Sequence, residues 1–269
     1  MQRMKQRLGR QETQMLAYLQ MRRQRLVRTG DLTSPLRLSR LQERELFRRM
    51  ARGKLIARVR PGLYLVPDTL PLGGAWTPSP ALALDALLED RRGAYQICGP
   101  NAFNRYGFDD QMPTRIYAYN NQISGDRSVG AVALTLIKVA DERLGGTETV
   151  TGPDGAVVRW SSRARTLVDA VYDWSRFRSL PRGFRWIESE LAAGRVRVAE
   201  LVRLTLRYGD VATTRRIGAL LEQLSGPGAQ LNRLARALPE TSGSIALNPG
   251  RPKRGSINRR WGVVINAWR

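Results

Sequence analysis

The spacing of apolar residues in the first third of the chain predicts helices. Apolar positions between Met15 and Leu19 share one face of a first helix. A stronger helical stripe begins after Ser39 and stops near Gly53. Between these two helices, residues 29–32 predict a short second helix or a turn.

Two short apolar runs follow and predict a β ribbon. Residues 55–60 predict one strand, in which Arg58 and Arg60 alternate with apolar residues, and residues 63–66 predict a second. Pro61-Gly62 between them favours a tight turn. Helices followed by a two-stranded ribbon are the layout of a winged helix-turn-helix, which we expect to occupy residues 1–70.

The predicted helix and ribbon carry the residue types that DNA recognition needs. A helix of about 12 residues fits the major groove, and a basic hairpin lies along the adjacent backbone or minor groove. The guanidinium group of arginine donates bidentate hydrogen bonds to guanine edges and to phosphates. Ser39 and Gln42 also have the spacing of a capping box. The candidate DNA-binding residues are Arg37, Ser39, Arg40, Gln42, Arg44, Arg48, Arg49, Lys54, Arg58, Arg60 and Tyr64.

A stretch rich in proline, glycine and threonine, residues 67–79, predicts a domain boundary. The second domain is expected over residues 79–269. It opens with an α+β section that has a mixed or antiparallel sheet, and from Ser162 its pattern becomes helical. The expected fold class is therefore α+β, with an N-terminal winged helix-turn-helix and a mixed α/β C-terminal domain whose second half is helical.

Charge strengthens the DNA-binding hypothesis. The chain has 45 Lys+Arg against 23 Asp+Glu, a net charge of +22, which favours a polyanionic partner. Residues 1–70 carry a net +12, the middle of the chain is nearly neutral, and residues 241–269 carry a net +6 with no acidic residue. Arginine enrichment from a GC-rich genome is the alternative explanation.

Composition excludes several kinds of chemistry. The chain has no histidine and one cysteine, Cys98, so an internal disulfide, a Cys/His zinc site and histidine-based catalysis are impossible. The carboxylate pair Asp109-Asp110 favours a turn or partner surface over a metal site, and Asp169 is expected to pair with an arginine or to cap a helix. We therefore expect no catalytic residues, no metal, no cofactor and no enzymatic activity. No apolar run is long enough to span a bilayer and no signal-peptide core follows Met1, so a cytoplasmic protein without membrane contact is expected.

Four stretches, in this order, resemble the AbiEi family, the antitoxin half of AbiE-like (type IV) toxin–antitoxin systems. They are RVRPGLYLVP (58–67), GPNAFNRYGF (99–108, closely followed by QMP at 111–113), SRARTLVD (162–169) and RIGALLE (216–222).

The resemblance implies a role in phage defence and two activities. Such antitoxins repress their own operon through the winged helix, which falls here on Arg37 through Arg60. Their C-terminal domain counters a toxin with a nucleotidyltransferase fold, directly or indirectly, and this part falls after Ser79. The implied partners are operator DNA and the toxin.

Other readings of the residues stay open. One is a nuclease that acts on DNA or RNA, and another is a winged-helix transcription factor that responds to a ligand. The basic segment 251–260 is either an additional nucleic-acid contact or a solvated loop.

Overall fold

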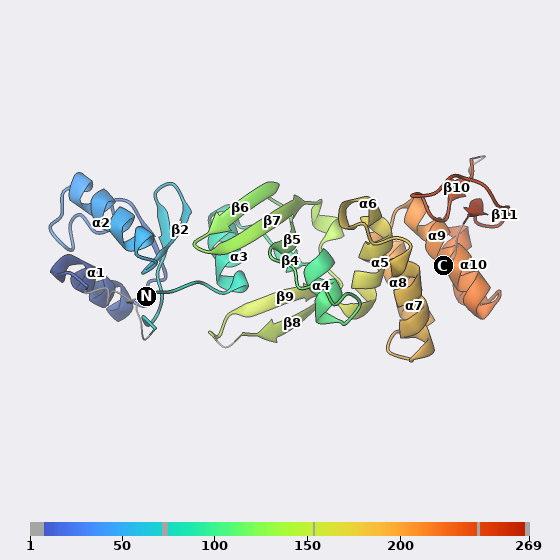
Figure 1. Cartoon of the computed structure of the whole chain (residues 1–269), viewed down its shortest axis with the longest axis horizontal. Coiled ribbons are helices and arrows are strands. Elements are labelled where there is room, and N and C mark those ends of the chain that lie inside the picture. Colours follow the sequence, from blue (N-terminus) through green and yellow to red (C-terminus); the bar gives the residue numbers. More distant parts are fainter. Residues whose placement is uncertain (1–7, 72–74, 153, 241–242, 267–269) are drawn as a thin grey trace, which may run out of the picture. The chain divides into compact units, whose positions relative to one another are not determined.

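The structure is a computed structural model that describes residues 8–71, 75–152, 154–240 and 243–266 (Figure 1). Strands and helices mix up to Ser161 and helices dominate afterwards, so the expected α+β class is confirmed. Among the described residues, no helix has the length and apolar character needed to cross a membrane.

The contacts between Cα atoms divide the chain into two compact units. Unit 1 contains the chain up to Tyr95, Thr114–Lys138 and Val150–Val158, and unit 2 contains Gln96–Pro113, Val139–Thr149 and the chain from Arg159. Unit 1 thus includes segments that follow the proline-rich stretch at 67–79. The division into separately folding domains 1–70 and 79–269 stays a prediction about folding.

Unit 1 begins with two helices and a small antiparallel sheet. The strands lie in the order β1-β3-β2. Ser39 and Gln42 form the predicted capping box at the start of α2, and Leu46, Phe47 and Met50 on its inner face are fully buried. The elements are α1 (Arg10–Met21), β1 (Leu26–Arg28), α2 (Arg40–Arg52), β2 (Ala57–Arg60) and β3 (Leu63–Leu65).

The segment 29–37 forms successive turns rather than a second helix. Gly30 has φ +111° and Arg37 has φ +50°, so left-handed residues lie at both ends of the segment and prevent helical continuation. The buried Glu43 of α2 accepts hydrogen bonds from the backbone amides of Gly30 (2.7 Å) and Leu32 (2.8 Å). A side chain of α2 therefore fixes the path of this segment.

The rest of unit 1 contains a helix and part of a mixed sheet, as the sequence predicted. Ser79 caps α3 and Pro80 is its first residue. Strand β7 pairs in parallel with β5 and antiparallel with β6, so the order is β6-β7-β5. The elements are α3 (Pro80–Leu88), the 3-10 helix η1 (Glu89–Arg91), β5 (Ile116–Asn120), β6 (Gly125–Val129) and β7 (Val132–Lys138).

The other elements lie wholly or mostly in unit 2. The second half of the chain is helical, as predicted, and ends in a small sheet with the order β10-β12-β11. The elements of this unit are β4 (Tyr95–Ile97), α4 (Gly99–Arg105), the 3-10 helix η2 (Asp141–Arg143), β8 (Thr147–Thr151), β9 (Val157–Ser161), α5 (Arg163–Tyr172), α6 (Trp174–Phe177), α7 (Arg182–Ala192), α8 (Val198–Tyr208), α9 (Val211–Ser225), α10 (Ala229–Arg236), β10 (Ile245–Ala246), β11 (Ser256–Asn258) and β12 (Val263–Ile265).

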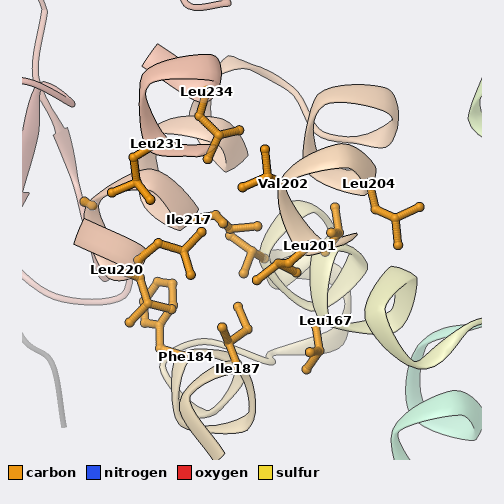
Figure 2. Close-up of a cluster of buried hydrophobic side chains, with 14 of the residues drawn as sticks. Leu167, Phe184, Ile187, Leu201, Val202, Leu204, Ile217, Leu220, Leu231 and Leu234 are labelled. Carbon is orange, nitrogen blue, oxygen red and sulfur yellow. The ribbon is translucent and has the colours of Figure 1, made fainter. Parts of the chain in front are cut away.

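The core of unit 2 lies between α5, α7, α8, α9 and α10 (Figure 2). Leu201 of α8 and Ile217 of α9 are fully buried near its centre. Trp261 packs onto α9 at Gly218, where an added Cβ would lie 2.2 Å from the indole ring. This close approach requires glycine and attaches the C-terminal sheet to the helical core.

Candidate nucleic-acid interface

Four of the predicted DNA-binding residues meet at one groove in unit 1. Arg44 and Arg48 lie one turn apart on the exposed face of α2, and Arg58 lies opposite Tyr64 in the β2–β3 ribbon. Their side chains line a hollow of about 510 Å³, which we call the basic groove. Its other lining residues are Thr29, Glu45, Ala51 and Gly62.

Aromatic packing holds the ribbon against the helix. The rings of Phe47 and Tyr64 stack with their centroids 4.6 Å apart and an interplanar angle of 20°. Gly62 has φ +78° in the turn between the strands, the left-handed conformation that glycine adopts without strain. The predicted Pro61-Gly62 turn thus places Arg58 beside the arginines of α2.

The basic groove has an excess of positive charge. Arg48 donates to Glu45 at 2.8 Å, but both side chains are largely exposed, so this ion pair is weak. Arg48 can therefore exchange Glu45 for another anionic partner. Within the described residues, neither Arg44 nor Arg58 forms an ion pair. Two guanidinium groups therefore remain available to an anion.

Several predicted residues lie outside the groove and have local partners. Ser39 and Gln42 satisfy each other in the capping box, with N···O distances of 3.2 and 2.8 Å. Arg49 points toward α1, where its Nε lies 3.3 Å from a carboxylate oxygen of Glu12. These three side chains support the helix in the observed structure.

The remaining predicted residues surround the ends of α2 and the ribbon. Arg37 and Arg40 are exposed near the start of α2. Lys54 follows the end of the helix with φ +56°, and its carbonyl accepts a hydrogen bond from the Trp76 amide. Arg60 is half-buried beside a register shift in the ribbon.

The sequence analysis did not identify Thr29, Glu45 or Glu43 as parts of this site. Thr29 and Glu45 line the groove, and the fully buried Glu43 fixes the segment that contains Thr29. Glu43 interrupts the apolar face of α2, and a carboxylate at such a position is the signal that could have indicated a buried hydrogen-bonding role.

In unit 2, the stretch 162–169 forms a buried ionic network. Arg165 is fully buried and donates to Asp169 (3.0 Å) and to the carbonyls of Gly145 (2.7 Å) and Arg143 (3.0 Å). The Arg143 side chain donates to the same carboxylate at 2.7 Å. The expected pairing of Asp169 with an arginine is confirmed, and its geometry is that of a structural clamp.

A second ionic cluster connects the stretch 99–108 to α7. Arg163 contacts the Tyr106 carbonyl and donates to Glu190 at 2.9 Å, and Arg195 also binds this carboxylate. Burial alone would raise the pKa of Glu190, but the two arginines lower it below its ordinary value. Burial, followed by the charge of Glu148, raises the pKa of Tyr106 to about 12.

The acidic residues considered for metal binding are dispersed or paired. Asp109 accepts a hydrogen bond from Arg182 at 2.7 Å. In the ranges that the structure describes, no three side chains of His, Cys, Asp or Glu come together as metal ligands. Among the described residues, the carboxylates therefore lack the convergent arrangement that a two-metal nuclease site needs.

No family model matches the sequence, and no curated protein matches it. Among solved structures, the chain is similar to the crystal structure of the RV2827C protein from Mycobacterium tuberculosis, with a TM-score of 0.57 and 17% sequence identity. The match covers 97% of this chain and 93% of that chain. At this identity, the likeness shows a shared fold over nearly the whole length.

Proposed function

We propose that this protein is an AbiEi-type antitoxin that represses its own operon by binding operator DNA. The observation that carries the DNA-binding part is the basic groove. It combines exposed arginines of a 13-residue helix with an arginine of the adjacent ribbon. In this proposal, residues 1–70 are a winged helix-turn-helix.

The groove suggests how the contacts are divided. Arg44 and Arg48 lie on the exposed face of α2, which has the dimensions of a recognition helix for the major groove. Arg58 and Arg60 on the ribbon reach the flanking phosphates or the minor groove. Phosphate contacts then set the register of the protein, and the helix reads the base edges.

The antitoxin part of the proposal rests on the resemblance of the four stretches. In the structure, two of these stretches meet at the contact between Arg163 and the Tyr106 carbonyl. A third stretch holds the C-terminal strands, because Arg216 donates to Ala246 and Glu222 accepts from Trp261. We infer that these stretches maintain a folded surface that counters a nucleotidyltransferase-fold toxin, directly or indirectly.

A paired assay separates the two activities in the full chain. The double variant Arg44→Ala/Arg58→Ala is expected to lose repression of a reporter placed behind the protein's own upstream DNA. The same variant is expected to retain rescue of growth when the neighbouring toxin gene is expressed. Full repression by the variant contradicts the DNA-binding site, and failure of the wild-type protein to rescue growth contradicts the antitoxin assignment.

A further inference from the structure

We propose that two adjoining hollows in unit 2 form a docking site for an acidic, amphipathic segment of a partner protein. The hollows lie along α8, and we call them the basic hollow and the apolar hollow. Arg197, which immediately precedes α8, lines both of them. The inference deepens the antitoxin part of the proposed function, on which the identity of the natural partner rests.

The sequences of α8 and α10 place apolar side chains inside and arginines outside. Leu201 of α8 and Leu231 and Leu234 of α10 belong to the core of unit 2 (Figure 2), and the two helices pack against each other. Residues 197–208 and 229–236 contain five arginines against one acidic residue. The outer surface of this pair of helices is therefore strongly basic.

The basic hollow contains arginine side chains that are available to a partner. Its volume is about 460 Å³, and Arg197, Arg203 and Arg233 line it. All three are exposed, and in the part of the chain that the structure describes their side chains form no hydrogen bond or ion pair. Glu200 lines the same hollow, so one carboxylate stands against three guanidinium groups. Guanidinium groups bind carboxylates with paired hydrogen bonds, so the basic hollow favours acidic side chains.

The apolar hollow lies between the ends of α7 and α9 and the start of α8. Its volume is about 540 Å³, and Glu188 and Ser225 are among its lining residues. Leu224, near the end of α9, remains 38% exposed although it is a large apolar side chain. An aliphatic side chain of a partner would remove this surface from water. The apolar residues that line the hollow are Leu191, Ala192, Val196, Val198 and Leu224.

Gln230 adds a requirement for a hydrogen-bond donor. It lines the basic hollow, and its side-chain oxygen is buried without a hydrogen-bond partner among the described residues. A buried acceptor without a donor costs free energy. The backbone N–H groups of a docked peptide can supply this donor, whereas ionised phosphate groups offer acceptor oxygens. Gln230 therefore favours a peptide over a phosphate backbone.

The two hollows together suit a protein segment better than other ligands. The arginines and Leu224 are exposed, whereas sites for small molecules enclose most of the ligand surface. A nucleic acid would contact the arginines through its phosphates and leave the aliphatic lining unfilled. An acidic, amphipathic segment uses both hollows, because its apolar side chain enters one and its carboxylates meet the arginines of the other.

The test measures binding of labelled peptides to the full chain by fluorescence anisotropy. The probe peptide has leucines at helical spacing among glutamates, and a scrambled peptide has the same composition. The arginine variant is Arg203→Gln/Arg233→Gln. Its matched control, Arg91→Gln/Arg92→Gln, removes the same charge from exposed residues of unit 1.

The apolar hollow has its own variant, Leu224→Gln. Leu41→Gln, a change at a leucine of α2 that is 71% exposed, is the control. A duplex DNA without the operator is titrated against the same proteins.

The wild-type protein is expected to bind the probe peptide at least about tenfold more tightly than the scrambled peptide. The arginine variant and Leu224→Gln are each expected to lose about fivefold or more in affinity for the probe, while both controls stay within about twofold. Equal binding of the two peptides, or equal losses in the variants and their controls, would overturn the proposal. Loss of DNA affinity in the arginine variant without loss of peptide affinity would assign the surface to nucleic acid instead.

Rescue of growth by the wild-type protein judges the antitoxin proposal separately. Selective peptide binding without rescue would retain the docking site and remove the antitoxin assignment. Rescue without selective peptide binding would retain the antitoxin assignment and remove the docking site.

Discussion

Individual side chains decide how the basic groove is built, and Glu43 is the clearest case. Its carboxylate is fully buried and accepts two backbone hydrogen bonds from the segment that contains Thr29. The apolar stripe predicted the buried face of α2 but not this role, because periodicity does not show which backbone amides a buried carboxylate meets. The sequence did predict the capping partners of α2, since a capping box depends only on local spacing.

We predict that Glu43→Ala destabilises the protein by about 2–4 kcal/mol, because it leaves the buried amide of Leu32 and the partly buried amide of Gly30 without their acceptor. Denaturant unfolding measures the change. Glu45→Ala, which removes an exposed carboxylate from the same helix, is expected to cost no more than about 1 kcal/mol. Equal costs for the two variants would refute the role given to Glu43.

The candidate arginines of α2 are not equivalent, although all of them were predicted to contact DNA. Arg44 lines the basic groove, whereas Arg49 lies against Glu12 of α1. We predict that Arg44→Ala weakens operator binding by about 1–3 kcal/mol and that Arg49→Ala has a smaller effect. A titration of operator DNA compares them, and a larger loss for Arg49→Ala would mean that α2 presents another face to DNA.

At the scale of elements, strands with a buried apolar face were predictable and exposed strands were not. Residues 115–119 alternate and residues 132–139 are mostly apolar, patterns that predict strands, and the structure forms β5 and β7 there. Strand β8 is exposed at every position, and only Val129 of β6 is buried. Pairing with a neighbouring strand, rather than burial of a face, stabilises such strands, so their sequences lack the period of two.

The attachment of the C-terminal sheet to α9 predicts a pH dependence of stability. Burial alone would raise the pKa of Glu222, but hydrogen bonds from Asn258, Arg260 and Trp261 lower it below its ordinary value of 4.5. Because the folded-state pKa is depressed, the ionised carboxylate stabilises the fold above pH 4.5. This contribution is lost as the pH falls from 4.5 through the folded-state pKa.

We therefore expect Glu222→Gln to reduce the stability difference between pH 7 and about pH 3, since the variant lacks the titrating group. Urea unfolding at several pH values measures this difference. Glu188→Gln, a change at an exposed residue of α7, serves as the control. An unchanged pH dependence in Glu222→Gln would show that this carboxylate does not stabilise the attachment of the C-terminal sheet.

At the scale of the whole molecule, charge and fold class were predictable, but the compact units were not. Net charge per segment follows directly from residue counts, and a mixed architecture follows from the change of hydrophobic period near Ser162. Unit 1 collects segments from three parts of the chain, because its strands come from sequence-distant regions. Such long-range pairing leaves no local signal in the sequence, and the same is true of the hydrogen bond from the Asn266 side chain to the Asn248 carbonyl.

The central claim is that this protein binds its own operator through the basic groove. The most direct test titrates the purified full chain against its own upstream DNA at several salt concentrations, with an unrelated duplex of equal length as the control. We predict a dissociation constant for the upstream DNA that is at least about 10³-fold lower than for the control, and a steep decrease of affinity with salt. Equal binding to both duplexes would contradict operator recognition. It would mean that the arginines of the groove bind polyanions without sequence selectivity.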